Sequence, residues 1–266
     1  MSSSDHRPVA LVTGASRGIG AATARELARR GYALCLAARS VDQLETLAAE
    51  LNEMGAPTLV VPTDVQQNDD LERLARQTLD HFGKVDVLIN NAAIVNPLLP
   101  VARLTGNQID AFVATNLVAS ITLTRLLLPS MIARRRGSIV FVNSVGGHIG
   151  LPTAALYSTT KSGIRGFAAA LRREVKHHNI KVSVVSPGFI NTTFVTLPGL
   201  FFLAPAEQVA RGIARIIARP RREMIVPAYY RLFIFFDRIF PLSVDIATRL
   251  YVTKVLFRGK RRADAP

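Results

Sequence analysis

Three side chains in the middle of the chain have the types and spacing of an acid–base group. Tyr157 and Lys161 are four residues apart in a stretch with helical periodicity, so they share one face of that helix. A phenol has a pKa near ~10, and a neighbouring ammonium lowers it toward neutral pH, where general acid–base catalysis works best. Ser144 precedes them and can hold a substrate oxygen. Alone, Tyr-x-x-x-Lys is common and typical of the polar face of an amphipathic helix.

A glycine-rich turn near the N-terminus has the pattern of a phosphate-binding loop. The apolar run Val9–Thr13 leads into Gly14, Gly18 and Gly20, and helical periodicity continues to about Arg30. Glycines allow a tight turn and a close approach to a pyrophosphate, and a helix start presents free N–H groups to it. A glycine-rich run can also be an ordinary loop. Its position between a strand and a helix favours a dinucleotide site.

The end of the second predicted strand indicates which dinucleotide binds. An acid there would accept a hydrogen bond from the ribose 2′-hydroxyl, whereas a cation would pair with a 2′-phosphate. The sequence has Arg39 and no acid before Asp42, and Arg17 lies in the glycine turn. Two guanidiniums suit a phosphate dianion, so we predict NADP(H) as the cofactor. A surface position for Arg39 without a binding role is the alternative.

Apolar strands and amphipathic helices alternate along the chain to position these groups. After the first strand we predict strands at 32–38, 58–62, 85–90, 138–143, 181–186 and 224–226. We predict helices from 18 to about 30 and near 44–51, 71–82, 108–134, 155–177 and 206–218, and Gly137 would cap the helix 108–134. Such strands are typical of a parallel sheet covered on both faces. We therefore predict an α/β fold with a Rossmann-type doubly wound parallel sheet. Residues 1–230 would form one catalytic domain, and 231–266 a basic, amphipathic, helical C-terminal extension.

Composition limits the class of protein. The chain has 266 residues, 49% of them hydrophobic, which suits one large domain. Its net charge of +14 could attract polyanions, but no zinc-finger or RNA-binding motif accompanies the scattered basic residues, so we predict no nucleic-acid partner. Cys35 is the only cysteine, and the five histidines lack metal-ligand spacing, so we expect no metal site. The N-terminal residues lack the apolar core of a secretory signal, which favours a cytoplasmic location.

Together these features resemble the short-chain dehydrogenase/reductase family, in its classical type. One departure is Ala93, where many members have glycine. The resemblance implies an oxidoreductase that interconverts a carbonyl and a secondary alcohol, and we expect a homodimer or homotetramer. The matching motifs occur in family order over about residues 8–230: Thr13-Gly14-x3-Gly18-x-Gly20, Asp64, Asn90-Asn91-Ala92, Asn116, Ser144, Tyr157-x3-Lys161 and Pro187-Gly188.

The resemblance also implies a role for each residue. Tyr157 would be the general acid in ketone reduction and the base in alcohol oxidation. Lys161 would bind the nicotinamide ribose and lower the Tyr157 pKa. Ser144 would hydrogen-bond to the substrate carbonyl. Asn116 would hold a water in a proton relay to Lys161, unless it is simply a helix-packing amide. The predicted cofactor-binding residues are Gly14, Ser16, Arg17, Gly18, Ile19, Gly20, Arg39, Asp64, Val65, Asn91, Ala92, Tyr157, Lys161, Pro187, Gly188, Ile190 and Thr192.

Two apolar segments bear on the substrate and on partners. The segment 194–203 would cover the substrate and suggests a lipophilic carbonyl compound, although packing on the core or on a partner subunit fits equally well. Residues 231–266 combine eight Lys and Arg with three Asp among aromatic runs. They would either lie on a membrane surface or pack as helices on the domain or a dimer. Charges interrupt every run before the ~18–20 residues of a spanning helix. The predicted substrate contacts are Ser144, His148, Phe194, Leu197 and Phe201.

Two other functions fit parts of the sequence. A 3-oxoacyl-carrier-protein reductase would use the basic surface to bind an acidic carrier protein, but it would not need the apolar C-terminal segment. A non-catalytic NADP-binding regulatory module would need the glycine turn but no proton donor. The complete set of Ser144, Tyr157, Lys161 and Asn116 argues against that second alternative.

Overall fold

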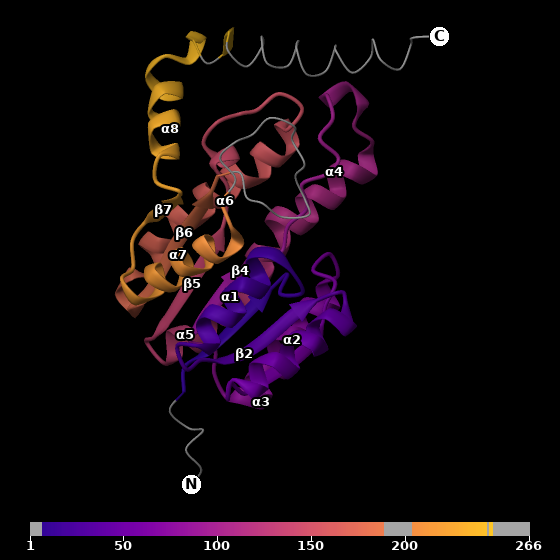
Figure 1. The fold of residues 1–266 in the computed structure, drawn as a ribbon, viewed down its shortest axis with the longest axis vertical. Coiled ribbons are helices and arrows are strands. Elements are labelled where there is room, and N and C mark those ends of the chain that lie inside the picture. The colour runs from indigo at the N-terminus through magenta and orange to yellow at the C-terminus, as the bar shows by residue number, and fades with distance from the viewer. Residues whose placement is uncertain (1–6, 189–203, 244, 247–266) are drawn as a thin grey trace.

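Seven parallel strands form the centre of the protein in the computed structural model, which describes residues 7–188, 204–243, 245 and 246 (Figure 1). Their order across the sheet is β3-β2-β1-β4-β5-β6-β7. The strands are β1 (Val9–Thr13), β2 (Ala33–Ala38), β3 (Thr58–Pro62), β4 (Val87–Asn90), β5 (Gly137–Val142), β6 (Ile180–Pro187) and β7 (Glu223–Val226). Each predicted strand is present, with ends shifted by at most two residues.

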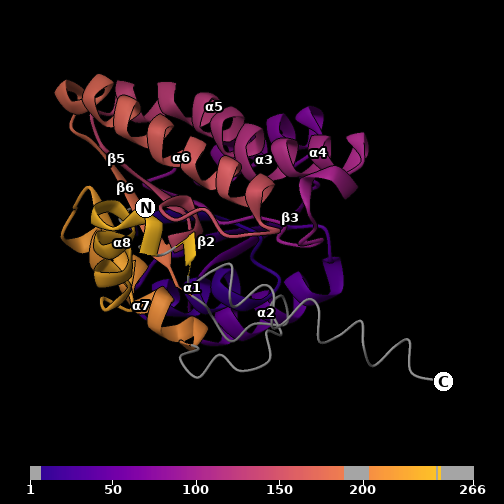
Figure 2. The same cartoon turned by 90° about the horizontal axis from the view of Figure 1, so that it is seen from above.

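Helices cover both faces of this sheet (Figure 2). On one face lie α1 (Gly18–Ala28), α2 (Val41–Glu53) and α7 (Ala206–Ala218). On the other lie α3 (Asn68–Phe82), α4 (Gly106–Val113), α5 (Ala119–Ala133) and α6 (Ala155–Glu174), and α8 (Tyr230–Ile239) follows β7. This arrangement confirms the predicted Rossmann-type, doubly wound α/β fold.

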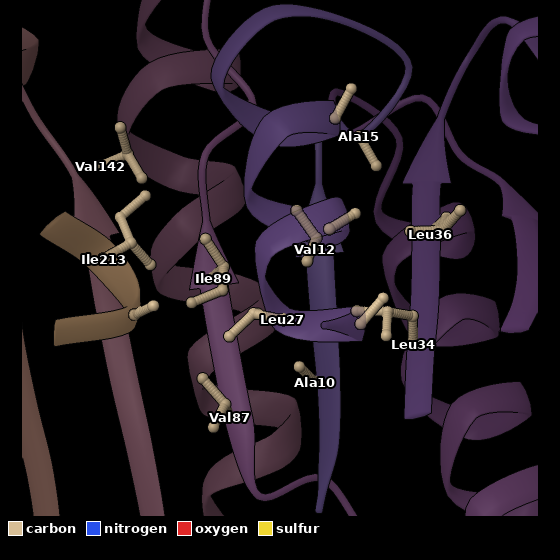
Figure 3. Close-up of a cluster of buried hydrophobic side chains, with 14 of the residues drawn as sticks. Ala10, Val12, Ala15, Leu27, Leu34, Leu36, Val87, Ile89, Val142 and Ile213 are labelled. Atoms are coloured by element: carbon tan, nitrogen blue, oxygen red, sulfur yellow. The ribbon is translucent and has the colours of Figure 1, made fainter. Parts of the chain in front are cut away.

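The core lies in two layers because successive strand residues point to opposite faces. In the layer under α1, Ala10, Val12 and Ile89 of the central strands pack with Leu27 of α1 and Ile213 of α7 (Figure 3). All five are fully buried. Strands buried on both faces need continuous apolar residues, which explains why these strands are apolar without alternation.

The strand order reverses direction at β1, which pairs with β2 on one side and β4 on the other. In open parallel sheets, ligands bind beyond the carboxyl ends of the strands at such a switch point. The glycine turn after β1, Asn91 after β4 and Ser144 after β5 all follow carboxyl ends of neighbouring strands. The topology therefore brings the predicted site residues to one edge of the sheet.

The long helix predicted at 108–134 differs from the structure in two details. A π-helical stretch, Ala114–Val118, separates α4 from α5. The prediction that Gly137 caps the helix is wrong, because Gly137 begins β5 and Arg135 takes the left-handed conformation (φ 50°). Gly137 is instead a packing position: a Cβ there would lie 2.6 Å from the sulfur of Met131.

The continuous helical segment Gly106–Ala133 is long and apolar enough to cross a membrane, with a mean hydropathy of 1.6. In this fold it covers the sheet instead. Leu123, Leu127 and Met131 are almost completely buried in the layer that α5 shares with α3 and α6. Its apolar character is therefore explained by core packing.

Candidate functional site

The turn between β1 and α1 has a backbone that favours glycine. Gly14 and Gly18 have φ of +64° and +57°, in the left-handed region that disfavours side chains. A Cβ on Gly20 would collide with the carbonyl oxygen of Gly14. Helix α1 starts at Gly18, and its N-cap residue Arg17 makes no side-chain capping bond. The first N–H groups of α1 therefore carry the positive end of the helix dipole toward this turn, which fits a pyrophosphate.

A threonine and an asparagine lock this turn against the end of β4. The Thr13 hydroxyl accepts hydrogen bonds from the N–H groups of Asn91 (3.0 Å) and Ala92 (3.1 Å). The Asn91 amide donates to the carbonyl oxygens of Thr13 (2.9 Å) and Gly14 (3.2 Å). These four hydrogen bonds fix the glycine turn to the end of β4. The sequence did not single out Thr13 for this role.

The end of β2 lies directly beside the glycine turn, because the Ala15 N–H donates to the Ala37 carbonyl (3.2 Å). Arg17 in the turn and Arg39 after β2 are both exposed at this edge. The next loop at the same edge is held by Asp70, which accepts from the Asp64 N–H (2.7 Å). This arrangement leaves two guanidiniums beside the turn.

Ser144 and Tyr157 form the centre of the acid–base group. Ser144 follows β5, and its hydroxyl accepts from the Gly146 N–H (3.1 Å) and hydrogen-bonds to the Tyr157 hydroxyl. A Cβ on Gly146 would lie 3.3 Å from the Tyr157 ring, so the glycine lets the ring approach the turn. The structure thus brings the two predicted residues into direct contact.

Lys161 lies one helical turn further along α6 and is almost fully buried. Its Nζ donates to the Val142 carbonyl (3.1 Å) and lies 5.7 Å from the centre of the Tyr157 ring. An ammonium has three donors, and among the described residues only the Val142 carbonyl accepts one of them. Unused donors on a buried cation at this edge fit the hydroxyls of a bound nucleotide.

Burial controls the ionisation of both groups. It raises the pKa of the Tyr157 phenol, and the hydrogen bond from Ser144 only partly offsets this. It lowers the pKa of Lys161 from 10.5 to about 8. Burial is the larger cause of the shift at Tyr157, and the expected lowering of this pKa by Lys161 stays a prediction. Tyr157 is therefore a neutral phenol at physiological pH, in the form that can donate a proton.

The family model described as short chain dehydrogenase matches residues 8–197, which include the glycine turn and the whole acid–base group. The chain belongs to the short-chain dehydrogenase/reductase family. As a member of this family, the protein is an oxidoreductase. Curated relatives agree: ketoacyl reductase HetN of Nostoc sp. is 34% identical over 248 residues, covering 88% of this chain and 86% of that protein.

Other relatives of this short-chain dehydrogenase/reductase are named as reductases too. The 3-oxoacyl-[acyl-carrier-protein] reductase FabG of Staphylococcus epidermidis is 35% identical over 182 residues, covering 68% of this chain and 74% of the relative. Among solved structures, a variant of actinorhodin polyketide ketoreductase with NADPH superposes with a TM-score of 0.79, at 30% identity, over 86% of this chain and 98% of its own. An alcohol dehydrogenase from Thermococcus sibiricus, complexed with 5-hydroxy-NADP, gives 0.77 at 28% identity, over 83% and 96%.

Asn116 holds three elements of this dehydrogenase/reductase together. Its Oδ1 accepts from the Ile94 N–H (2.8 Å), and its Nδ2 donates to the Ile94 carbonyl (2.9 Å) and to the Thr160 hydroxyl (3.3 Å). It lies in the π-helical stretch, a deviation that is frequent at functional sites. Both amide hydrogens are used by protein groups. A water relay at Asn116 therefore remains a prediction, and it would have to use another atom of the residue.

A cluster around Glu223 was not predicted from the sequence. The Glu223 carboxylate lies 2.7 Å from His148 Nε2, accepts from the Ser186 hydroxyl (2.6 Å) and is 3.6 Å from Arg165 Nε. Burial opposes ionisation of Glu223, but the bonds from His148 and Ser186 outweigh it and hold the pKa below its usual range. The only sequence signal was an acid beside two arginines at the start of a strand.

This cluster supports the turn that carries Ser144. His148 ends that turn, and its Gly147 carbonyl accepts from the Ser162 hydroxyl and from Arg165 Nη1, both at 3.0 Å. The predicted substrate contact His148 is thus mostly buried and paired with Glu223. Through Glu223, His148 connects the turn that carries Ser144 to the edge strand β7.

Some of the remaining predicted site residues are described by the structure, and others lie outside the described residues. Pro187 ends β6, and Gly188 lies against the ring of Tyr230, which would collide with any Cβ there. Ser16, Ile19 and Val65 are partly exposed near the glycine turn and the end of β3. The predicted cofactor contacts Ile190 and Thr192 and the predicted substrate contacts Phe194, Leu197 and Phe201 lie outside the described residues.

Proposed function

We propose that this protein is an NADPH-dependent reductase of a lipophilic carbonyl compound, which it converts to a secondary alcohol. The observation that carries the proposal is the hydrogen bond of Ser144 to the partly exposed Tyr157 phenol, with Lys161 Nζ 5.7 Å from its ring centre. A protonated phenol is ready to give its proton to a carbonyl oxygen. In alcohol oxidation the same hydroxyl would take up the proton instead, so the reducing direction is supported by the NADP(H) preference.

The reaction divides between the cofactor and three side chains. Bound NADPH would supply a hydride to the carbonyl carbon. The Ser144 hydroxyl would hold the carbonyl oxygen beside Tyr157, whose hydroxyl would donate its proton to that oxygen as negative charge develops there. Lys161 would bind the ribose hydroxyls with its unused donors and keep positive charge near the developing phenolate.

The glycine turn and two arginines support the choice of cofactor. The turn would hold the pyrophosphate, and Arg17 and Arg39 would pair with the 2′-phosphate that distinguishes NADP(H) from NAD(H). Arg39 is exposed at the end of a strand with no acid at that position. Both solved relatives described above hold NADP-type cofactors, in line with this assignment.

The test of this function is NADPH oxidation with a series of carbonyl substrates, from short ketones to long-chain and polycyclic compounds. We expect the catalytic efficiency to rise with apolar size. Tyr157→Phe should reduce turnover by at least about a hundredfold, the usual contribution of a general acid, while NADPH binding stays intact. Turnover by Tyr157→Phe at the wild-type rate would overturn the assignment of Tyr157.

A second candidate is 3-oxoacyl-carrier-protein reductase, the activity named for several relatives at 35–39% identity. The net charge of +14 would suit an acidic carrier protein. The two candidates separate in one comparison, because a carrier-linked 3-oxoacyl chain should be preferred strongly over the same free lipid only if the second is correct. We also propose a homodimer or homotetramer, which light scattering would test, and a location in the cytoplasm.

A further inference from the structure

Helix α8 exposes its apolar side chains, whereas a surface helix of a water-soluble protein usually exposes its polar ones. Toward the protein it presents Tyr230, which is buried, and Ile234 and Asp237, which are half-buried. The side chains directed outward are large and apolar, and between 46% and 60% of each is exposed. They are Leu232, Phe233, Phe235, Phe236 and Ile239.

The apolar surface continues beyond the helix. Phe240, Leu242 and Ile246 are exposed by 52%, 76% and 62%. Soluble monomers rarely expose a contiguous patch of this kind, and where one exists it usually marks a site of interaction. We call this surface, formed by α8 and residues 240, 242 and 246, the α8 face.

The α8 face is anchored at the edge of the sheet that carries the candidate active site. Helix α8 begins four residues after the carboxyl end of β7, and Tyr230 packs against Gly188 at the carboxyl end of β6. In Figure 1, α8 and α4 lie at the same end of the molecule. The apolar face and the substrate side of the protein therefore share one end.

We propose that the α8 face lies in the interface of an anionic membrane, with the helix parallel to the surface. Charge identifies this partner. Arg231 and Arg238, seven residues apart and both exposed, lie on the same side of α8 at the border of its apolar face. Long basic side chains at such a border extend to lipid phosphates while the aromatic residues enter the acyl region. Residues 231–266 contribute eight basic and three acidic side chains, and the whole chain is +14.

A second copy of the chain fits the α8 face less well. Pairing two α8 faces would bring the Arg231 and Arg238 guanidiniums of both copies together, and such like charges repel. An anionic lipid surface attracts each added basic residue instead. The charge that opposes pairing through the α8 face thus favours lipid.

This docking would place the substrate side against the bilayer. A lipophilic carbonyl compound could then pass from the membrane to Tyr157 without crossing water. That consequence rests on the proposed reductase function, whereas the docking itself does not.

The test measures cosedimentation of the full-length protein with vesicles of phosphatidylcholine alone or mixed with phosphatidylglycerol. We expect binding to be at least about tenfold tighter when phosphatidylglycerol is present, and to weaken with salt. The double variant Phe233→Ser, Phe236→Ser should lose binding by at least about tenfold, because the apolar residues provide the insertion. The double variant Arg231→Gln, Arg238→Gln should keep weak binding but lose most of the preference for phosphatidylglycerol. The matched control Val41→Ser, Met54→Ser removes two exposed apolar side chains at the two ends of α2 and should bind as wild type.

Three outcomes would overturn the proposal. The wild-type protein could remain in solution with both vesicle types, or bind both equally. Alternatively, light scattering could show a dimer that dissociates in the Phe233→Ser, Phe236→Ser variant while vesicles are not bound, which would assign the α8 face to a second copy. NADPH oxidation with a short, water-soluble ketone separates this test from the proposed function, since it should be unchanged in all three double variants.

Discussion

At the scale of single residues, Lys161 of the candidate site is unfavourable for stability. Lys161 is a cation that is almost fully buried, with no acid paired to it among the described residues. Such burial disfavours the charged form and lowers the pKa to about 8. Under the proposed function this loss of stability is tolerated because the ammonium would bind the nucleotide and act beside Tyr157.

Replacing Lys161 with methionine should therefore stabilise the protein while it abolishes turnover. At neutral pH we expect the free energy of unfolding to rise, by at most about 3 kcal/mol, because the buried charge is removed. The pKa of Lys161 in the folded protein lies below the unfolded value of 10.5. The loss of stability from burying the charge is therefore complete below about pH 8, and it disappears as the pH rises from about 8 to 10.5. The difference between Lys161→Met and wild type should shrink accordingly.

Denaturant unfolding at several pH values measures this difference. The control is Lys176→Met, which removes an exposed lysine and should show no such pH-dependent gain. A Lys161→Met protein that is less stable than wild type at neutral pH would contradict the desolvation argument.

At the scale of elements, contacts between strands, turns and helices hold the site in place. The Glu223 cluster ties the edge strand β7 to β6, to α6 and to the turn that carries Ser144. Glycines allow close contacts in the same way: Gly137 admits the Met131 side chain of α5 onto β5. Both devices connect segments that are distant in the sequence or belong to different elements.

Glu223→Gln should act on turnover more than on cofactor binding. The amide keeps the shape but loses the charge that holds His148 and Arg165, so the turn bearing Ser144 should loosen. We expect kcat to fall about tenfold, equivalent to about 1.4 kcal/mol in the barrier, with an unchanged Kd for NADPH. Steady-state kinetics and titration with NADPH measure the two effects. Glu53→Gln, on the exposed end of α2, is the control. A variant with normal kcat and only a lower Tm would assign Glu223 a purely structural role.

Gly137→Ala should destabilise the protein without any change at the site. The added methyl would lie 2.6 Å from the Met131 sulfur, and overpacking of this kind costs about 1–3 kcal/mol. Thermal unfolding measures the loss. Gly106→Ala adds the same methyl where no atom lies within 4 Å, so its Tm should be close to that of wild type. Equal stability of both variants would show that Met131 moves aside freely.

At the scale of the whole molecule, the sheet edge combines a cationic nucleotide site with an apolar end. The net charge of +14 is spread over the chain, but Arg17 and Arg39 lie at the glycine turn and Arg231 and Arg238 at the α8 face. Different anions would therefore be bound at different places on the same molecule.

Cofactor binding should raise the stability of the entire protein in proportion to affinity. If Arg17 and Arg39 bind the 2′-phosphate, NADPH should bind at least about tenfold tighter than NADH, which adds about 1.4 kcal/mol at equal saturating concentrations. Thermal shift measurements with each dinucleotide show this as a larger rise in Tm for NADPH. The double variant Arg17→Gln, Arg39→Gln should remove the difference, and Arg76→Gln, an exposed arginine on α3, should not. Equal shifts in the wild type would refute the role of the two arginines.

Local patterns in the sequence were sufficient for the fold and for the centre of the site. Apolar runs, helical periodicity and the glycine turn depend on residues close in sequence, and the predicted strands agree with the structure within two residues. The family motifs added the order in which Ser144, Tyr157 and Lys161 occur. The failed prediction for Gly137 had a tertiary cause, since its need for glycine comes from Met131 rather than from its own φ angle.

The acid–base group shows which properties follow from the sequence and which follow only from the tertiary structure. The sequence by itself determined that Tyr157 and Lys161 share a helix face with Ser144 nearby, because helical spacing and strand ends are local properties. Only the tertiary structure decided that the Tyr157 pKa shifts upward from its usual value, because the shift depends on burial by distant segments. It also decided that Glu223 supports the turn of Ser144 and that α8 turns its aromatic residues outward. These properties come from contacts across many residues of chain, which a local pattern does not encode.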